Sequence, residues 1–386
     1  RVREAQLEDG AIPWTVPDTR GNKIASSGWG DVATIIPWKI YMRTGDIGFL
    51  EDNFEMMKHW VAYHQKKSNK YISNMMSFSD WLQPYPESGK NTGDTSRNLI
   101  GTAFFARSAK LTAQSAQVLG KTEEQEKYEA LYKSVASSFE NKFFDEKGTV
   151  KGVTETQTSY LLALAFDLLP ENKIKNAQTN LLRKLEDADN HLRTGFLGTP
   201  LLSKVLDEMG EVDLMYKLLF NETYPSWFYS INQGATTIWE RWNSFSKTEG
   251  YNPMSMNSLN HYAYGAIGEW MYERVAGIAP LEPGYKQIKI APQVRKPLTS
   301  ASAELTTPYG KVSSSWKIRV DEFHLDIVIP PNTNAIVIVS ADTRKELLLN
   351  GIPFKDNSNV KLLNSTKDAF ELEVKSGKYS FQATIK

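Results

Sequence analysis

The spacing of apolar residues changes once along the chain, near Gly277, and this change limits the possible folds more than any other feature of the sequence. Before it, apolar side chains recur at steps of three and four, as on one face of a helix; Leu50, Phe54 and Met57 begin such a series. Beyond it they alternate with their neighbours, as in Leu325–Ile329. The stretch GIAPLEPGY, which starts at Gly277, is typical of a linker. The sequence therefore predicts a helical domain over residues 1 to 277 and an antiparallel β-sandwich over residues 278 to 386.

In the helical part, the pattern of helical stretches separated by short loops predicts antiparallel helix pairs. One helix is expected over Val32–Thr44, although Pro37 should end or kink its first turns. Another, over about Leu259–Val275, is apolar on most of its circumference and is expected to be buried. In the β part, Asn350 and Gly351 predict a hairpin turn. Further helices are predicted over residues 96 to 119, 122 to 144, 156 to 168, 171 to 186, 200 to 209 and 211 to 220.

Composition excludes several classes of function. Lys plus Arg and Asp plus Glu both number 45, so the formal charge is zero. A neutral chain has no broad field to attract a polyanion, and nucleic acid is not an expected partner. The absence of cysteine excludes disulfides, cysteine-ligated zinc and thiol catalysis. The sequence has no apolar run of about 18 residues, so no membrane span is expected. We expect neither a metal ion nor a cofactor.

The segment QGATTIWERWNSF places one acid, Glu240, among Trp239, Arg241 and Trp242. Indoles can stack on the apolar faces of a sugar ring, and a carboxylate near an arginine can orient or deprotonate a water molecule. The alternative is a helix with two buried rings and a solvent-facing Glu/Arg couple. The composition of the segment leaves both interpretations open.

Other residues are placed where a sugar site could form. Nine of the ten tryptophans precede the linker, so such a site is expected in the helical part. Trp316, within an alternating strand, gives only weak support to a sugar-binding role for the β domain. His261 lies at the start of the last predicted helix, where a ligand role and a capping or packing role are equally favoured. His64 continues the helical series that begins with Leu50, Phe54 and Met57, and it is interpreted as a core histidine.

Five motifs in order, GWGDVATIIPW (28 to 38), SDWL (79 to 82), TGFLGTP (194 to 200), GATTIWERW (234 to 242) and SLNHYAYG (258 to 265), resemble those of the bacterial α-L-rhamnosidases of glycoside hydrolase family 78. They cover nearly the whole helical part. The resemblance implies a mainly α then β chain, in which an (α/α)6-barrel catalytic domain precedes a C-terminal β-sandwich.

The resemblance also implies a glycoside hydrolase that removes terminal α-L-rhamnose from glycosides or polysaccharides by inversion. Glu240, in GATTIWERW, would be the general base. The substrate-binding residues carried over from the other motifs are Trp29, Asp31, Trp38, Asp80, Trp81 and His261. Trp242 would line the pocket or pack behind Glu240. Arg241 would tune Glu240 or form a structural ion pair, and the ion pair is favoured.

An inverting site needs a second carboxyl about 6.5 to 9.5 Å from the first, to protonate the leaving oxygen. The resemblance places this acid in a loop that precedes the stretch AQLEDGAIPWTVPDT, residues 5 to 19 here. We therefore expect the acid upstream of Arg1, an N-terminally incomplete barrel, upstream domains of the same polypeptide, and weak or no hydrolysis by this chain alone. Glu4, Glu8 and Asp9 are poor substitutes, since the resemblance puts them on a surface helix and turn.

Two alternatives stay open. One is a different glycosidase, or a polysaccharide lyase, on the same barrel; the lyase is disfavoured because no Lys/Arg cluster accompanies Glu240 in the sequence. The other is a catalytically incomplete carbohydrate-binding fragment. The expected partner is a rhamnose-containing carbohydrate, and the aglycone, the oligomeric state and the compartment (bacterial cytoplasm, periplasm or exterior) are left open.

Overall fold

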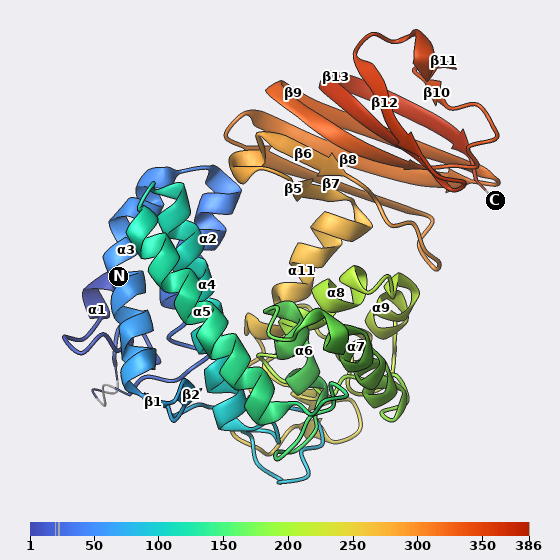
Figure 1. Cartoon of the computed structure of the whole chain (residues 1–386). Helices are drawn as coiled ribbons and strands as arrows, with labels where there is room; N and C mark the ends of the chain where they lie inside the picture. Colours follow the sequence, from blue (N-terminus) through green and yellow to red (C-terminus); the bar gives the residue numbers. More distant parts are fainter. Residues whose placement is uncertain (20, 22–23, 386) are drawn as a thin grey trace. The chain divides into compact units, whose positions relative to one another are not determined.

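The computed structural model describes residues 1–19, 21 and 24–385. The chain forms two compact units (Figure 1). The first comprises Arg1–Trp38 and Ile47–Ala266, and the second comprises Lys39–Asp46 and Ile267–Lys386. The second unit thus begins before the predicted linker at Gly277 and also takes in the end of an early helix. No helix in the described part of the chain is both long and apolar enough to cross a bilayer.

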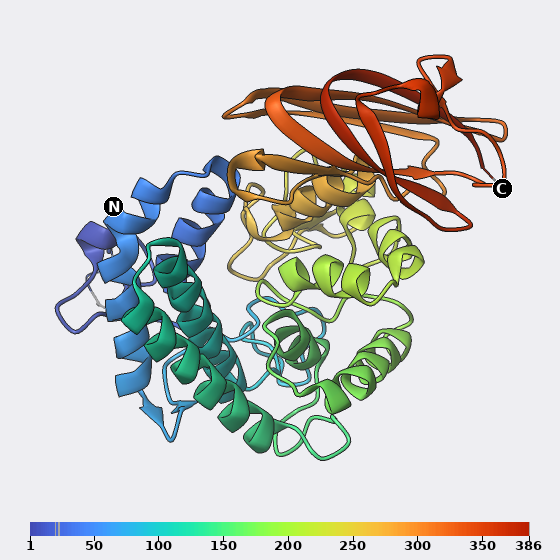
Figure 2. The same ribbon diagram turned by 45° about the horizontal axis from the view of Figure 1, so that its top comes forward.

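The first unit is built from helices, most of them within a few residues of their predicted bounds. Successive pairs follow one another round an arc (Figure 2). The helices are α1 (Val2–Ala5), α2 (Val32–Thr44), α3 (Ile47–Lys66), α4 (Arg97–Val118), α5 (Thr122–Phe143), α6 (Gln157–Ala165), α7 (Glu171–Glu186), α8 (Thr199–Glu208), α9 (Val212–Leu219) and α10 (Trp227–Asn232). Short hairpins add β1 (Ser68–Asn69), β2 (Ile72–Ser73), β3 (Phe245–Ser246) and β4 (Gly250–Tyr251).

Local sequence explains where these helices begin and end. Ser96 and Thr156 precede α4 and α6, and each side chain accepts a hydrogen bond from the backbone N–H three residues on. Gly45 ends α2 in the left-handed region, with φ at 73°. Pro37 was expected to end or kink the first turns of α2, and it does not end them, because the helix continues through it. Pro37 removes one backbone bond, and it is buried with Ala33 and Thr34 on the face that packs into the core.

The last helical stretch differs from its prediction. It begins late, with a 3-10 turn η1 (Ala263–Ala266), and continues as α11 (Ile267–Trp270) and a π-helical turn η2 (Met271–Val275). It is not buried all round, because Met271 is 44 % exposed. The start is delayed because the preceding backbone bonds elsewhere: His261 N–H donates to the Ile238 carbonyl, 2.8 Å away.

The described residues of the second unit form a nine-stranded sheet. Its strands are β5 (Ile278–Pro280), β6 (Gln287–Ile290), β7 (Ser300–Thr307), β8 (Gly310–Arg319), β9 (Glu322–Ser340), β10 (Leu348–Leu349), β11 (Ile352–Pro353), β12 (Val360–Ser365) and β13 (Ala369–Thr384). The long strands β9 and β13 pair along their length and change register between Lys375 and Gly377. One half of this pair carries β7, β8, β10 and β11, and the other carries β5, β6 and β12. One pairing, β6 with β9, is parallel and departs from the antiparallel prediction.

Two sequence expectations for the β part can be checked directly. Asn350 and Gly351 join β10 to β11 with φ values of 52° and 84°, which confirms the predicted hairpin turn. Trp316 is 1 % exposed, and its indole N–H donates to the Val275 carbonyl at 2.7 Å. Trp316 is therefore part of the sandwich core and is closed to a sugar ligand.

Candidate active site

The segment that carries Glu240 is a loop and not a helix, so the helical interpretation of WERW is wrong. It leaves α10 and runs alongside a second loop, residues 258 to 261. Glu240 N–H donates to the Ser258 carbonyl at 2.9 Å, and His261 N–H donates to the Ile238 carbonyl. These backbone bonds bring Glu240 and His261, which are 21 positions apart in the sequence, onto neighbouring segments.

Glu240 is nearly buried, with 8 % of its surface exposed. Its Oε2 accepts a hydrogen bond from the Ser258 N–H at 2.9 Å. No group in the described part of the chain donates to its Oε1. The rings of Trp239 and Trp242 on either side are 7 % and 4 % exposed, and both pack into the protein. The carboxylate is thus fixed through one oxygen and can accept a hydrogen bond at the other.

Arg241 does not form the ion pair expected from the sequence. Among the described residues, its guanidinium donates to the carbonyls of Ser255 and Met256 and to Asn91 Oδ1, at 2.9 to 3.3 Å, and it joins no ion pair. Burial lowers its pKa, and the charge of Glu240 partly offsets this. Arg241 therefore ties together three loop segments beside the base while supplying a nearby positive charge.

Three cationic side chains lie on or beside a pocket next to the segment that carries Glu240. Arg241 and Lys90 line one pocket, and the Arg193 guanidinium lies 4.3 Å from the ring centroid of Tyr85 in the same pocket. These cations come from three loops that are far apart in the sequence, so no local pattern could indicate them.

The surroundings of His261 fit a capping and packing role and also leave one ring nitrogen for a ligand. Its Nδ1 accepts a hydrogen bond from the Ala263 N–H at 3.2 Å, as a cap of the 3-10 turn would. Nδ1 must then be the unprotonated nitrogen of a neutral ring, which leaves the proton on Nε2. The ring packs on Phe196, with centroids 4.8 Å apart. His261 is thus held by a turn and a phenyl ring, and its Nε2–H is left to donate.

Asp80 is fully buried and accepts hydrogen bonds from the TGFLGTP loop. The N–H groups of Gly195, Leu197 and Gly198 donate to it at 2.7, 2.9 and 3.0 Å, and the Thr158 hydroxyl donates as well. Burial raises the pKa of this carboxyl, while the four hydrogen bonds oppose the rise. The three backbone N–H donors lie just before α8, and free N–H groups at the start of a helix favour an anion. Asp80 therefore fixes the loop that carries Phe196.

Asp31 is likewise fully buried. Its Oδ1 accepts from Ser108, Trp60 and His64 at 2.7, 3.0 and 3.1 Å, and its Oδ2 accepts from the Gly28 N–H at 2.8 Å. Burial alone would raise its pKa, but the charge and hydrogen bond of His64 and the other donors outweigh burial and lower it. His64 has no exposed surface and is a core histidine, as the sequence indicated.

Four aromatic side chains form a cluster, and two of them, Trp29 and Trp81, are close in sequence to Asp31 and Asp80. Phe78 stacks on Trp14 at 4.5 Å and meets Trp29 and Trp81 edge-on at 5.2 and 5.6 Å between centroids. All four are half-buried, so the cluster has faces open to a ligand. Trp38 is placed elsewhere, against the helix core cluster that contains Phe54, Met57 and Leu111.

The structure therefore gathers the predicted residues in two ways. Backbone bonds join the segments that carry Glu240 and His261, and Phe78 links Trp29 to Trp81. Asp31 and Asp80 are hydrogen-bonded within the protein, Trp242 stacks on Tyr264 and lines a pocket, and Trp38 packs apart. Sequence reasoning missed the residues Phe78, Phe196, Ser258 and Thr158. Phe196 and Ser258 lie inside quoted motifs, so they were the two that could have been found. Within the described residues, no group of three or more His, Asp or Glu is arranged to hold a metal ion.

Comparison with known proteins matches nearly all of the chain to one family. The bacterial alpha-L-rhamnosidase 6 hairpin glycosidase domain matches residues 1–275, and the bacterial alpha-L-rhamnosidase C-terminal domain matches residues 277–349. A protein named alpha-L-rhamnosidase from Formosa agariphila is 66 % identical over 382 residues, 99 % of this chain. One from Alteromonas sp. is 53 % identical over 337 residues, 86 % of the chain. The chain spans 41 % and 37 % of the lengths of these two relatives.

Solved structures agree with these matches. The α-L-rhamnosidase of Streptomyces avermitilis, complexed with L-rhamnose, has a TM-score of 0.90 at 36 % identity and covers 99 % of this chain, which covers 35 % of it. That of Dictyoglumus thermophilum also has a TM-score of 0.90, at 29 % identity, with coverages of 99 % and 42 %. The predicted architecture, helices of an (α/α)6 barrel followed by a β-sandwich, is confirmed. The chain belongs to the bacterial α-L-rhamnosidase family.

Proposed function

We propose that this chain carries the water-activating and rhamnose-binding part of an inverting α-L-rhamnosidase, with Glu240 as the general base. One observation carries the proposal: Glu240 is nearly buried, is fixed through Oε2 by the Ser258 N–H, and has Oε1 unoccupied by any described group. A base needs this combination, because a fixed carboxylate with one available oxygen can hold a water molecule and take its proton.

The neighbouring side chains suit a rhamnose ring. The Nε2–H of His261 donates to a ring hydroxyl, since its Nδ1 is already engaged by the Ala263 N–H. The aromatic cluster of Trp29, Phe78 and Trp81 offers apolar faces for the C6 methyl group. Asp31 and Asp80 act through other residues, because both carboxylates are buried and fully hydrogen-bonded within the protein.

The general base can be tested without depending on a general acid. An α-L-rhamnosyl fluoride or dinitrophenyl α-L-rhamnoside has a leaving group that needs no protonation. We expect Glu240→Gln to lower kcat on these substrates by about 10²- to 10⁴-fold, because the amide cannot accept the proton of the attacking water. Glu222→Gln, at an exposed position, is the matched control and should keep wild-type turnover.

Product stereochemistry tests inversion. Proton NMR of the first-formed sugar should show β-L-rhamnose from the α-linked substrate. The α-anomer would contradict an inverting mechanism, and wild-type kcat in Glu240→Gln would contradict the base assignment. Binding of L-rhamnose without turnover of any activated rhamnoside would favour the carbohydrate-binding alternative.

A further inference from the structure

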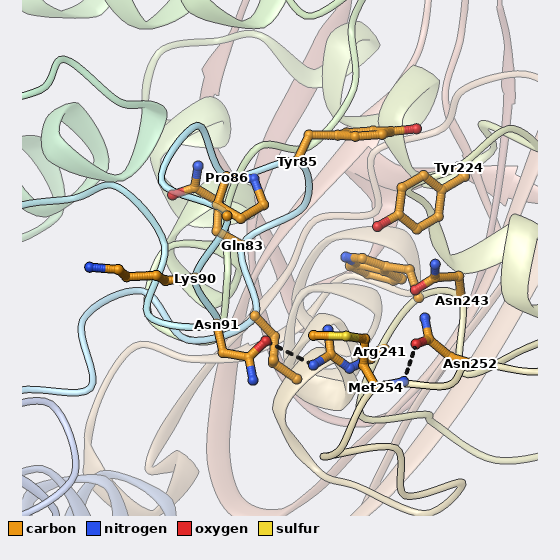
Figure 3. A pocket seen from close by; sticks show the side chains of 13 residues that line it. Gln83, Tyr85, Pro86, Lys90, Asn91, Tyr224, Arg241, Asn243, Asn252 and Met254 are labelled. Carbon is orange, nitrogen blue, oxygen red and sulfur yellow. Dashed lines mark hydrogen bonds between the residues drawn. The ribbon is translucent and has the colours of Figure 1, made fainter.

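A pocket of about 190 Å³ opens beside the loop that carries Glu240 (Figure 3). Two loops of the first unit, residues 82 to 91 and 241 to 254, form most of its wall, and Tyr224 completes it. Arg241 and Trp242, which directly follow Glu240, both line it. At roughly 30 Å³ for each water molecule, the space suits about six waters, which is the scale of one pyranose ring.

Aromatic rings form one side of this pocket. Tyr85 and Tyr224 meet edge-on, with centroids 5.1 Å apart and planes at 83°, and Figure 3 shows them together at one edge. Tyr85 is 58 % exposed even though Arg193 stacks on its ring. An exposed ring at the mouth of a pocket is suited to packing against the C–H face of a sugar.

The pocket also contains hydrogen-bonding groups that the protein itself leaves unused. Asn91 accepts from Arg241 at 2.9 Å, and Asn252 accepts from the Met254 N–H at 2.9 Å. In contrast, the half-buried side-chain amide of Asn243 makes no hydrogen bond with the described residues. The Nε1–H of Trp242 is buried and has no partner among them. The Trp242 N–H is closed to solvent, whereas the half-buried amide of Asn243 is available to a polar ligand.

A ring of planar amides and aromatic faces is the chemistry that recognises a hydroxyl-rich sugar. The pocket adjoins the proposed rhamnose position, because its lining residue Trp242 stacks on Tyr264 at 3.9 Å and Tyr264 meets Phe196, the ring that supports His261. We propose that this pocket is a second sugar-binding site, which holds a further sugar residue of the saccharide whose terminal rhamnose reaches Glu240. The inference rests on the proposed function for the identity of that saccharide.

Equilibrium binding tests the second site independently of turnover. Regioisomeric α-L-rhamnosyl-D-glucose disaccharides and larger saccharides that extend them are titrated into the full chain by calorimetry, with L-rhamnose alone as the reference. We expect at least one saccharide to bind about tenfold more tightly than L-rhamnose, since a second ring adds stacking and hydrogen bonds.

Two variants localise the effect. Tyr85→Ala and Asn243→Ala should each weaken binding of that saccharide by about threefold to tenfold and leave L-rhamnose binding unchanged. Tyr85 is exposed and the Asn243 side chain makes no hydrogen bond with the described residues, so neither change should impair folding. Tyr272→Ala, which removes an exposed tyrosine outside the pocket, is the matched control and should bind as wild type does.

The two failures can be told apart. If no saccharide binds more tightly than L-rhamnose, or if Tyr85→Ala and Asn243→Ala leave saccharide binding at the wild-type level, the second site is wrong, whatever the turnover of activated rhamnosides. If the activated rhamnosides are not turned over but the saccharide preference and its loss in both variants are observed, the catalytic proposal fails and the second site stands.

Discussion

Asp80 shows how a buried carboxylate can organise a site that it does not touch. Its four hydrogen bonds hold the loop from Gly195 to Gly198, and that loop holds Phe196 against His261. The SDWL motif suggested a sugar ligand at this position. The geometry instead favours a positioning role, since both oxygens are occupied by protein donors.

Asp80→Asn tests that role. The amide nitrogen would face N–H donors, so at least one bond is lost and the loop shifts. We expect kcat/KM on activated rhamnosides to fall by about tenfold to a hundredfold, with weaker L-rhamnose binding. Circular dichroism should show retained helices. Thr158→Val, which removes only one of the four donors, should have a smaller effect; equal losses in both variants would contradict the loop-positioning role.

Asp31 gives a prediction for pH. Its folded-state pKa lies below the ordinary value of 3.8, chiefly because the contribution of His64 outweighs that of burial. The folded protein therefore binds fewer protons here than the unfolded chain, so the stabilisation is present above pH 3.8 and is lost as pH falls through the folded pKa.

Urea unfolding of wild type and Asp31→Asn from pH 7 to pH 3 measures this stabilisation. At pH 7 we expect the variant to lose about 3 to 5 kcal/mol, because a buried ionic partner of His64 is removed. The difference between the two proteins should shrink on acidification below pH 3.8. A difference that is constant across this range would show that the Asp31 charge does not contribute.

At the scale of elements, the TGFLGTP loop depends on glycine for close approach. A Cβ on Gly195 would lie 2.3 Å from the carbonyl oxygens of both Asp80 and Trp81, and those backbone atoms cannot swing aside. Gly195→Ala should therefore destabilise the protein by about 1 to 3 kcal/mol and weaken rhamnose binding. Gly268→Ala, in α11, meets nothing within 4 Å and should leave both unchanged. Thermal melting measures the stability of both variants, and calorimetry measures their binding of L-rhamnose. Equal values for Gly195→Ala and Gly268→Ala would contradict the packing argument.

The helices were predictable where local signals act alone. Ser96 caps α4, Gly45 ends α2, and the apolar spacing of α3 follows its buried face. The stretch after Leu259 was not predictable in the same way, because its backbone bonds to residues 238 to 240 instead of starting a helix. The parallel pairing of β6 with β9 is also non-local, and alternation of side chains cannot distinguish it from an antiparallel pairing.

In the candidate site, too, local sequence signals were predictable and non-local contacts were not. Glu240 and His261 were recognised from their motifs, and the structure adds that backbone bonds join their segments. The roles of Asp31 and Asp80 were not readable, because their partners, such as Ser108 and Thr158, lie 77 and 78 positions away. A motif identifies which carboxylates matter, whereas only the fold shows which oxygens are already bonded.

At the scale of the whole molecule, we propose Gly277 as the boundary between the two domains. It has φ at 90°, in the left-handed region, and an added Cβ would lie 2.4 Å from the Pro292 nitrogen, so the position requires glycine where the backbone at Pro292 passes. The matched family domains also meet between residues 275 and 277. The compact units part earlier, after Ala266, because η2 packs with β5 and α11 packs with η2.

The predicted site supplies a candidate base but no accessible second carboxylate. Inversion needs a base and an acid, and Glu240 is the one carboxylate of the predicted site with an oxygen that no described group occupies. Asp31 and Asp80 have no exposed surface and cannot protonate a leaving oxygen. Turnover by the 386-residue chain should therefore depend steeply on the leaving group.

We expect the ratio of kcat on α-L-rhamnosyl fluoride to kcat on a methyl or glucosyl rhamnoside to exceed the ratio of their uncatalysed rates by a factor of about 10² to 10⁴. Initial rates on a series of aryl rhamnosides of graded phenol pKa give the slope; a flat dependence, or efficient cleavage of the glucosyl rhamnoside, would show that the chain supplies its own acid.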